Sequence, residues 1–122
     1  MKRQSILFAA GLLLVAAASL PMIRAGAQQA AVTDDNLNQM IASAKTPSDH
    51  EAIAAYYEQE AADAKKKADL HRKTAETYRE LKILKPANMA EMCDNMAATW
   101  DKAAAEATKL AKANHVLAKT PG

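Results

Sequence analysis

The chain has 122 residues, of which 50% are hydrophobic, 25% are charged and only 4% are aromatic. This length allows one small domain. A single cysteine excludes a framework of internal disulfides, so packing alone must hold the fold.

The first 27 residues have the layout of a secretory signal peptide. Lys2 and Arg3 form a basic start, residues 6–20 are an apolar run, and the Ala-Gly-Ala sequence at 25–27 fits a cleavage site. Cleavage there leaves 95 residues with 13 Lys and Arg against 14 Asp and Glu, so the net charge falls from +2 to about −1. This balance argues against nucleic-acid binding, and no later apolar run is long enough to cross a bilayer. We therefore expect a periplasmic or secreted protein.

Residues 28–45 read as a polar tail that contains one short helix. Leu37, Met40 and Ile41 give it a modest amphipathic pattern, which predicts a helix at roughly 34–44. The remaining chain, residues 46–120, is predicted to form a helical hairpin.

The first long helix is predicted at about 47–84. Thr46 can cap it, Pro47 suits its first turn, and Ser48 with Glu51 matches a capping box. No Gly or Pro follows until residue 86. A heptad pattern of mostly Ala and Tyr marks the face expected to be buried, at positions 50, 54, 57, 61, 64, 68, 71, 75 and 78.

The second long helix is predicted at about 88–118. Pro86 ends the first helix, and Asn88 with Glu91 is expected to cap the second. Its predicted buried face again steps by four and three, at Met89, Cys93, Met96, Trp100, Ala103, Ala107, Leu110, Asn114 and Leu117.

The short connection predicts an all-α fold in which the two helices lie antiparallel. Alignment about a turn at residues 85–86 places His71 opposite Trp100 and Tyr57 opposite Asn114. Alanine-rich faces bury little area, and two helices give a thin core. We therefore expect a homodimer that forms a four-helix bundle, or pairing with a partner helix.

Four sulfur-containing residues recur on one face at the start of the second helix: Met89, Met92, Cys93 and Met96. Thioether and thiolate ligands suit a soft ion such as Cu(I), so copper or silver binding is one interpretation. The alternative is structural, because Met fills irregular gaps and free Cys behaves as a small buried hydrophobe.

The three histidines could assist such a site, but they fit a structural role better. His50 and His71 lie three heptads apart, about 30 Å along the helix, and cannot share an ion within one chain. A site formed by His50 and His115 is the remaining possibility, particularly across a dimer. Polar residues on a heptad face more often set register and partner number.

Catalytic motifs are lacking. The sequence contains no Gly-rich phosphate loop, no nucleophile elbow and no His-Glu-x-x-His zinc motif. The sequence therefore favours a non-enzymatic protein without a cofactor, with Cu(I) as the alternative.

The segment from Ser43 to Tyr57, with Thr46-Pro47 followed by His50, resembles the opening of a group of small secreted bacterial proteins without an assigned activity. In that group a second helix often opens with a His-Cys pair. Here Cys93 matches, whereas Met92 stands where the His would be. Over residues 43–118 the resemblance implies secretion and a helical hairpin, and no particular chemistry.

Overall fold

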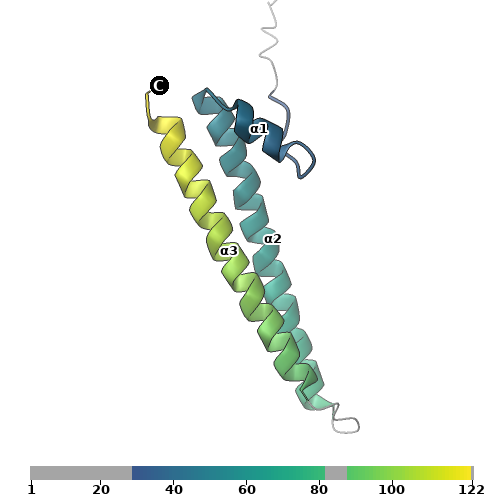
Figure 1. Cartoon of the computed structure of the whole chain (residues 1–122). Coiled ribbons are helices and arrows are strands. Elements are labelled where there is room, and N and C mark those ends of the chain that lie inside the picture. Colours follow the sequence, from purple (N-terminus) through teal and green to yellow (C-terminus); the bar gives the residue numbers. More distant parts are fainter. Residues whose placement is uncertain (1–28, 82–87, 122) are drawn as a thin grey trace, which may run out of the picture.

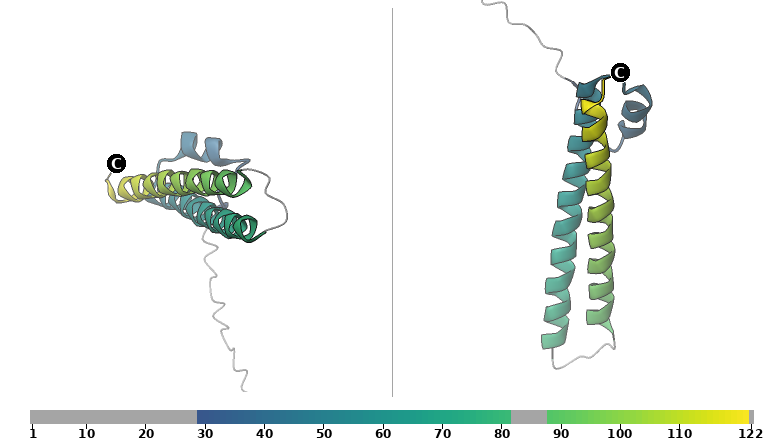
Figure 2. Two further views of the ribbon diagram at one scale, coloured as in Figure 1. Left: turned by 90° about the horizontal axis from the view of Figure 1, so that it is seen from below. Right: turned by 90° about the vertical axis from the view of Figure 1, so that its left-hand side faces the viewer.

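The computed structural model describes residues 29–81 and 88–121, within which the chain forms three helices and no strand. These are α1 (Leu37–Ser43), α2 (Pro47–Glu80) and α3 (Met89–Lys119). α2 and α3 run side by side in opposite directions, and α1 lies beside the N-terminal end of α2 (Figures 1 and 2). The predicted all-α hairpin is confirmed. The signal-peptide prediction and Pro86 lie outside the described residues.

α2 begins at a capping box, although a different one from that predicted. The Thr46 hydroxyl accepts from the Asp49 backbone N–H at 3.1 Å, and the Asp49 carboxylate accepts from the Thr46 N–H at 2.8 Å. Hydrogen bonds from the backbone N–H groups of Lys45 and Thr46 hold the pKa of Asp49 below its usual value. Ser48 and Glu51 do not form the box because the helix starts at Pro47, which makes Thr46 the N-cap.

The other helix ends also differ from the predictions. α2 ends at Glu80 rather than near residue 84, and α1 starts at Leu37 rather than near residue 34. Asn88 precedes α3 in the left-handed region, with φ of 79°, and its side chain makes no capping hydrogen bond. Asn tolerates this conformation, so its role here is the backbone turn into the helix.

The core between α2 and α3 consists almost entirely of alanine. Ile53 is the only fully buried side chain among the described residues that is larger than Ala. The pattern predicted for α2 is confirmed at its alanines, which are all buried, while its His and Tyr positions are half-buried. The buried alanines are Ala54, Ala61, Ala64, Ala68 and Ala75 of α2 and Ala97, Ala104 and Ala111 of α3.

The pattern predicted for α3 is wrong at every second position. Met96, Ala103, Leu110 and Leu117 are exposed, and the neighbouring positions 97, 104 and 111 are buried instead. The α2 face is lined with alanine, so the helices approach closely only where α3 also presents small side chains. The helix is therefore rotated so that its large residues lie at the side of the contact.

The pairing of the two helices is shifted from the predicted alignment. His50, rather than Tyr57, lies opposite Asn114, with 3.3 Å between the His50 Nδ1 and the Asn114 Oδ1. Lys67, rather than His71, lies over Trp100.

Candidate functional site

A line of exposed residues along α3 is the most extensive uncovered feature of the hairpin. Its four large apolar side chains, Met92, Met96, Leu110 and Leu117, are between 45% and 62% exposed. The positions follow a heptad pattern, stepping by four and three along the helix. We call this set the α3 stripe; it comprises Met92, Met96, Thr99, Ala103, Glu106, Leu110, Ala113 and Leu117.

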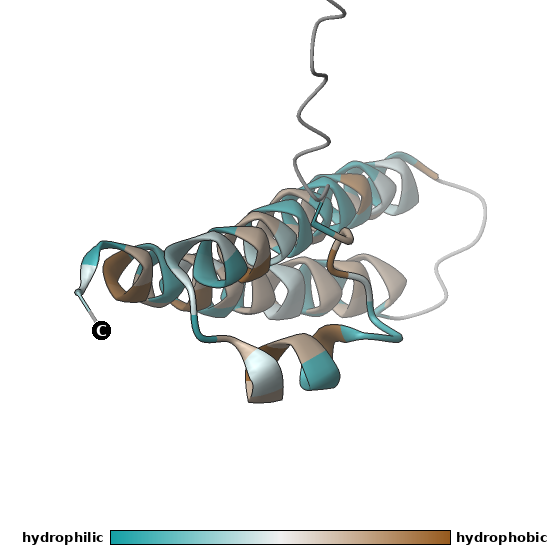
Figure 3. Ribbon diagram, turned by 90° about the horizontal axis from the view of Figure 1, so that it is seen from above, coloured by the Kyte–Doolittle hydropathy of each residue, from teal (hydrophilic) through white to brown (hydrophobic). Residues whose placement is uncertain are grey.

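The α3 stripe lies beside the contact with α2. Successive residues of a helix are turned by about 100°, which places the centre of the stripe roughly 100° around α3 from the buried face. Figure 3 shows strongly hydrophobic residues in the last turns of α3, near the C-terminus. In a four-helix bundle each helix has two neighbours roughly at right angles, so α3 has the geometry for a second neighbour.

The opposite side of the hairpin is closed by ion pairs between the helices. Arg72 of α2 pairs with Asp101 of α3, and Arg79 of α2 pairs with Asp94 of α3. His115, near the end of α3, contacts two carboxylates of α2 on the same side. We call this side the ion-pair flank. Among the described residues, its contacts between α2 and α3 are made by charged side chains rather than by a row of apolar ones.

His115 joins the C-terminal part of α3 to the start of α2. Its Nδ1 lies 2.8 Å from Glu51 Oε2 and its Nε2 lies 2.9 Å from Glu58 Oε1. Both ring nitrogens must donate to make both bonds, so the arrangement requires the protonated imidazolium. The hydrogen bond to Glu58, reinforced by that to Glu51, raises the pKa of His115 above its usual value.

The other two histidines have separate positions. His50 lies opposite Asn114, so the structure brings His50 and His115 to the same end of the hairpin. His71 is half-buried in the middle of α2. Neither His50 nor His115 reaches the sulfur residues, which lie at the other end of α3. Within residues 29–81 and 88–121 no three His, Cys, Asp or Glu side chains are grouped to hold a metal ion.

The four sulfur residues occupy the first two turns of α3, where Met96 is buried less than expected. Met89 and Cys93 are half-buried, whereas Met92 and Met96 are exposed. The cluster therefore opens to solvent and overlaps the start of the α3 stripe.

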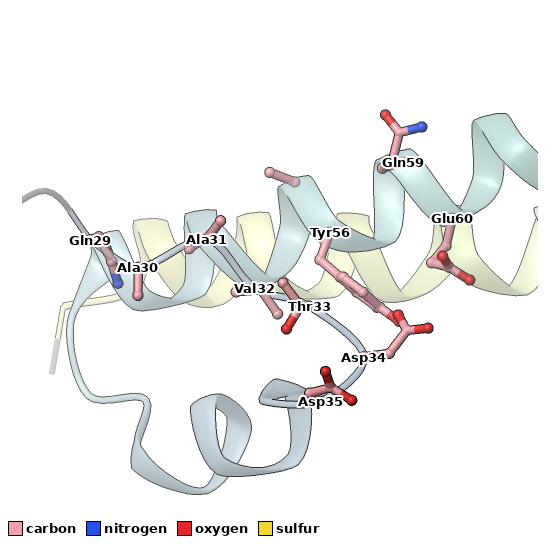
Figure 4. A pocket seen from close by; sticks show the side chains of 12 residues that line it. Gln29, Ala30, Ala31, Val32, Thr33, Asp34, Asp35, Tyr56, Gln59 and Glu60 are labelled. Carbon is pink, nitrogen blue, oxygen red and sulfur yellow. The ribbon is translucent and has the colours of Figure 1, made fainter.

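A groove also lies between α2 and the segment of residues 29–35 (Figure 4). The Tyr56 hydroxyl donates to Asp34 Oδ1 at 2.8 Å, and this hydrogen bond raises the pKa of Tyr56 to about 12. Gln29 donates to Asp49 at 2.7 Å and accepts from Ser48. These contacts fasten the segment to α2.

Comparisons with known proteins add no relative. No family model, curated protein or solved structure matches this chain. In addition, none of the helices in the described ranges combines the length and apolar character that a membrane span needs.

The contacts of His115 predict a pH dependence of stability. Because the folded-state pKa is raised, the contribution of His115 is fully present below its unfolded pKa of about 6.5 and is lost as the pH rises through the folded-state value. The free energy of unfolding, measured by urea denaturation at one protein concentration between pH 6 and 8, should therefore fall over that range.

The matched variants are His115→Gln and His71→Gln. The His115→Gln change should flatten the pH dependence of the free energy of unfolding. The His71→Gln change should leave that pH dependence unaltered, because His71 forms no ion pair with a described residue. An unchanged pH dependence in His115→Gln would show that the two carboxylate contacts do not stabilise the hairpin.

Proposed function

We propose that this chain is an exported, non-enzymatic helical-hairpin protein that acts in the bacterial envelope by association, most simply with a second copy of itself. The α3 stripe is the observation that carries the proposal. Monomeric helices normally turn their large apolar residues inward. Here Met96, Leu110 and Leu117 lie outside, while the inside is alanine.

The thin core supports the same proposal. Eight of the nine buried residues in the described ranges are Ala, which contribute little apolar area each. Burying the exposed halves of four large side chains per copy would contribute about 1 kcal/mol each, or roughly 8 kcal/mol for two copies. This gain corresponds to a dissociation constant of about 1 μM before the entropy costs of association. Because these costs weaken association, we expect a dimer that forms only at concentrations well above about 1 μM.

Sedimentation of protein produced from the full sequence tests self-association. The sedimentation coefficient and the thermal midpoint should both rise with concentration up to several hundred micromolar, because folding and association are linked by mass action. Leu110→Lys places a charge in the α3 stripe and should keep the protein monomeric over this range.

The matched control is Ala105→Lys, which adds the same charge to the exposed side of α3 away from both α2 and the stripe. It should associate like the parent protein. A parent protein that stays monomeric throughout, or a Leu110→Lys variant that associates normally, would contradict the proposal.

Export rests on the N-terminal pattern of a basic start, an apolar run and a small-residue cleavage site. Expression in a bacterial host should yield a processed protein whose intact mass places its N-terminus at Gln28. Retention of Met1 on a membrane-bound product would show that the segment is an anchor instead.

Soft-metal binding is the second candidate function, and the exposure of Met92 and Met96 on either side of Cys93 favours it. Anaerobic titration with Cu(I) against a competing chelator should then show binding that the double change Met92→Leu and Cys93→Ser abolishes. Met40→Leu in α1 is the control and should bind like the parent. Retention of less than about a tenth of an equivalent by the parent protein would eliminate this candidate.

A further inference from the structure

We propose that two copies pair through their α3 stripes in an antiparallel arrangement, about a two-fold axis level with residues 104–105. This inference rests on the proposed self-association and specifies its geometry. It is carried by the order of residues along the stripe, by the charges of α2 beside it, and by the position of α1.

The α3 stripe is complementary to its own reverse. In antiparallel heptad pairs, each position of one type faces a position of the other type. Met96 then faces Ala113 of the second copy, Leu110 faces Thr99, and both pairs share one midpoint between residues 104 and 105. Met92 and Leu117 share this midpoint as well and pair two large side chains at each end, so large residues meet small ones only in the central part of the stripe.

A parallel pairing would be less favourable. It would place Glu106 opposite Glu106 of the second copy, two like charges in one layer. In the antiparallel pairing Glu106 faces Ala103, and Lys102 and Lys109 on either side supply opposite charge. Lys109 already contacts Glu106 at 2.7 Å within the helix.

The angle between the two faces of α3 favours the same symmetry. A two-fold axis perpendicular to the helices leaves both copies of α2 on one side of the α3 pair, which completes a four-helix bundle. An axis parallel to the helices would place the two copies of α2 on opposite sides, where they could not pack.

The charges of α2 at the level of the axis are complementary. Asp63 and Lys67 line a shallow groove together with Trp100 and Ala103 of α3, so they lie beside the centre of the α3 stripe. They are symmetric about residue 65, and the axis would bring Asp63 of one copy toward Lys67 of the other. Lys67 is held at this level by its ammonium group, 4.2 Å from the centre of the Trp100 ring.

No described element covers the α3 stripe. The groove of segment 29–35 is completed by residues of α2, and no residue of α3 lines it. Helix α1 also packs against α2. The stripe is therefore uncovered on α3 itself, whereas segment 29–35 occupies the neighbouring face of α2 at Tyr56 and Glu60.

Cross-linking tests the register. Met96→Cys and Ala113→Cys are made separately in a Cys93→Ser background, so that each protein carries one thiol, and both positions are exposed in the monomer. Under mild oxidation with glutathione disulfide, an equal mixture should form the mixed dimer, identified by its mass. Each variant alone should cross-link several-fold more slowly.

Faster self-cross-linking of Met96→Cys would overturn the antiparallel arrangement. An absence of cross-links, while sedimentation of the parent protein still shows a dimer that Leu110→Lys disrupts, would overturn the register and leave the proposed function standing. A parent protein that never dimerises would overturn both.

A charge exchange gives an independent measurement. Asp63→Lys should weaken dimerisation about tenfold, because one substitution turns two attractions into two repulsions across the axis. Adding Lys67→Asp should restore most of the loss. Equal dimerisation of all three proteins would show that α2 does not meet α2 at this level.

Discussion

The close approach of α2 and α3 through alanine determines the rest of this structure. Ala61, Ala64 and Ala68 on one helix and Ala97, Ala104 and Ala111 on the other are buried, and small side chains allow two helix backbones to lie near each other. Close packing gives many weak dispersion contacts but removes little apolar area from water. The alanine contact thus fixes how the two helices pack but contributes little hydrophobic stabilisation. The residues beside the contact, on the ion-pair flank and in the α3 stripe, therefore matter more for the stability of the hairpin.

The alanine contact also explains how far sequence reasoning reached. Helix number, antiparallel pairing and the buried alanines of α2 followed from heptad spacing and from the absence of Gly and Pro. The orientation of α3 did not, because the heptad rule assigns the largest apolar residues to the inside. Leu110 and Leu117 would hold the helices apart, so Ala111 and its equivalents take the inner positions instead. Two heptad patterns on α3 differ by one position, one with Leu110 inside and one with Ala111 inside. The small alanines of α2 that face α3 select the second pattern.

The same error affected the candidate site. The four sulfur residues were expected on one helix face, with Met89, Cys93 and Met96 buried, but the rotation of α3 exposes Met96. The partners of the histidines depend on register between helices, which shifts with the length of a connection. His50 lies opposite Asn114 in place of Tyr57, and His115 contacts both Glu51 and Glu58. Of the predicted caps, only the start of α2 at Thr46 and Pro47 was correct, because these two residues act within one turn.

The two sides of the hairpin are chemically different, and this difference limits how it can associate. Charged residues of α2 and α3 satisfy one another on the ion-pair flank, so a second molecule would gain little there. The other side offers the α3 stripe, whose large apolar residues remain partly in water. A protein with a single associating side can form a closed pair, whereas two such sides would permit open chains. If the chain associates as proposed, ion pairs on one flank and apolar residues on the other would favour a discrete two-fold assembly over a fibre, and a change of one residue in the α3 stripe would affect that assembly most.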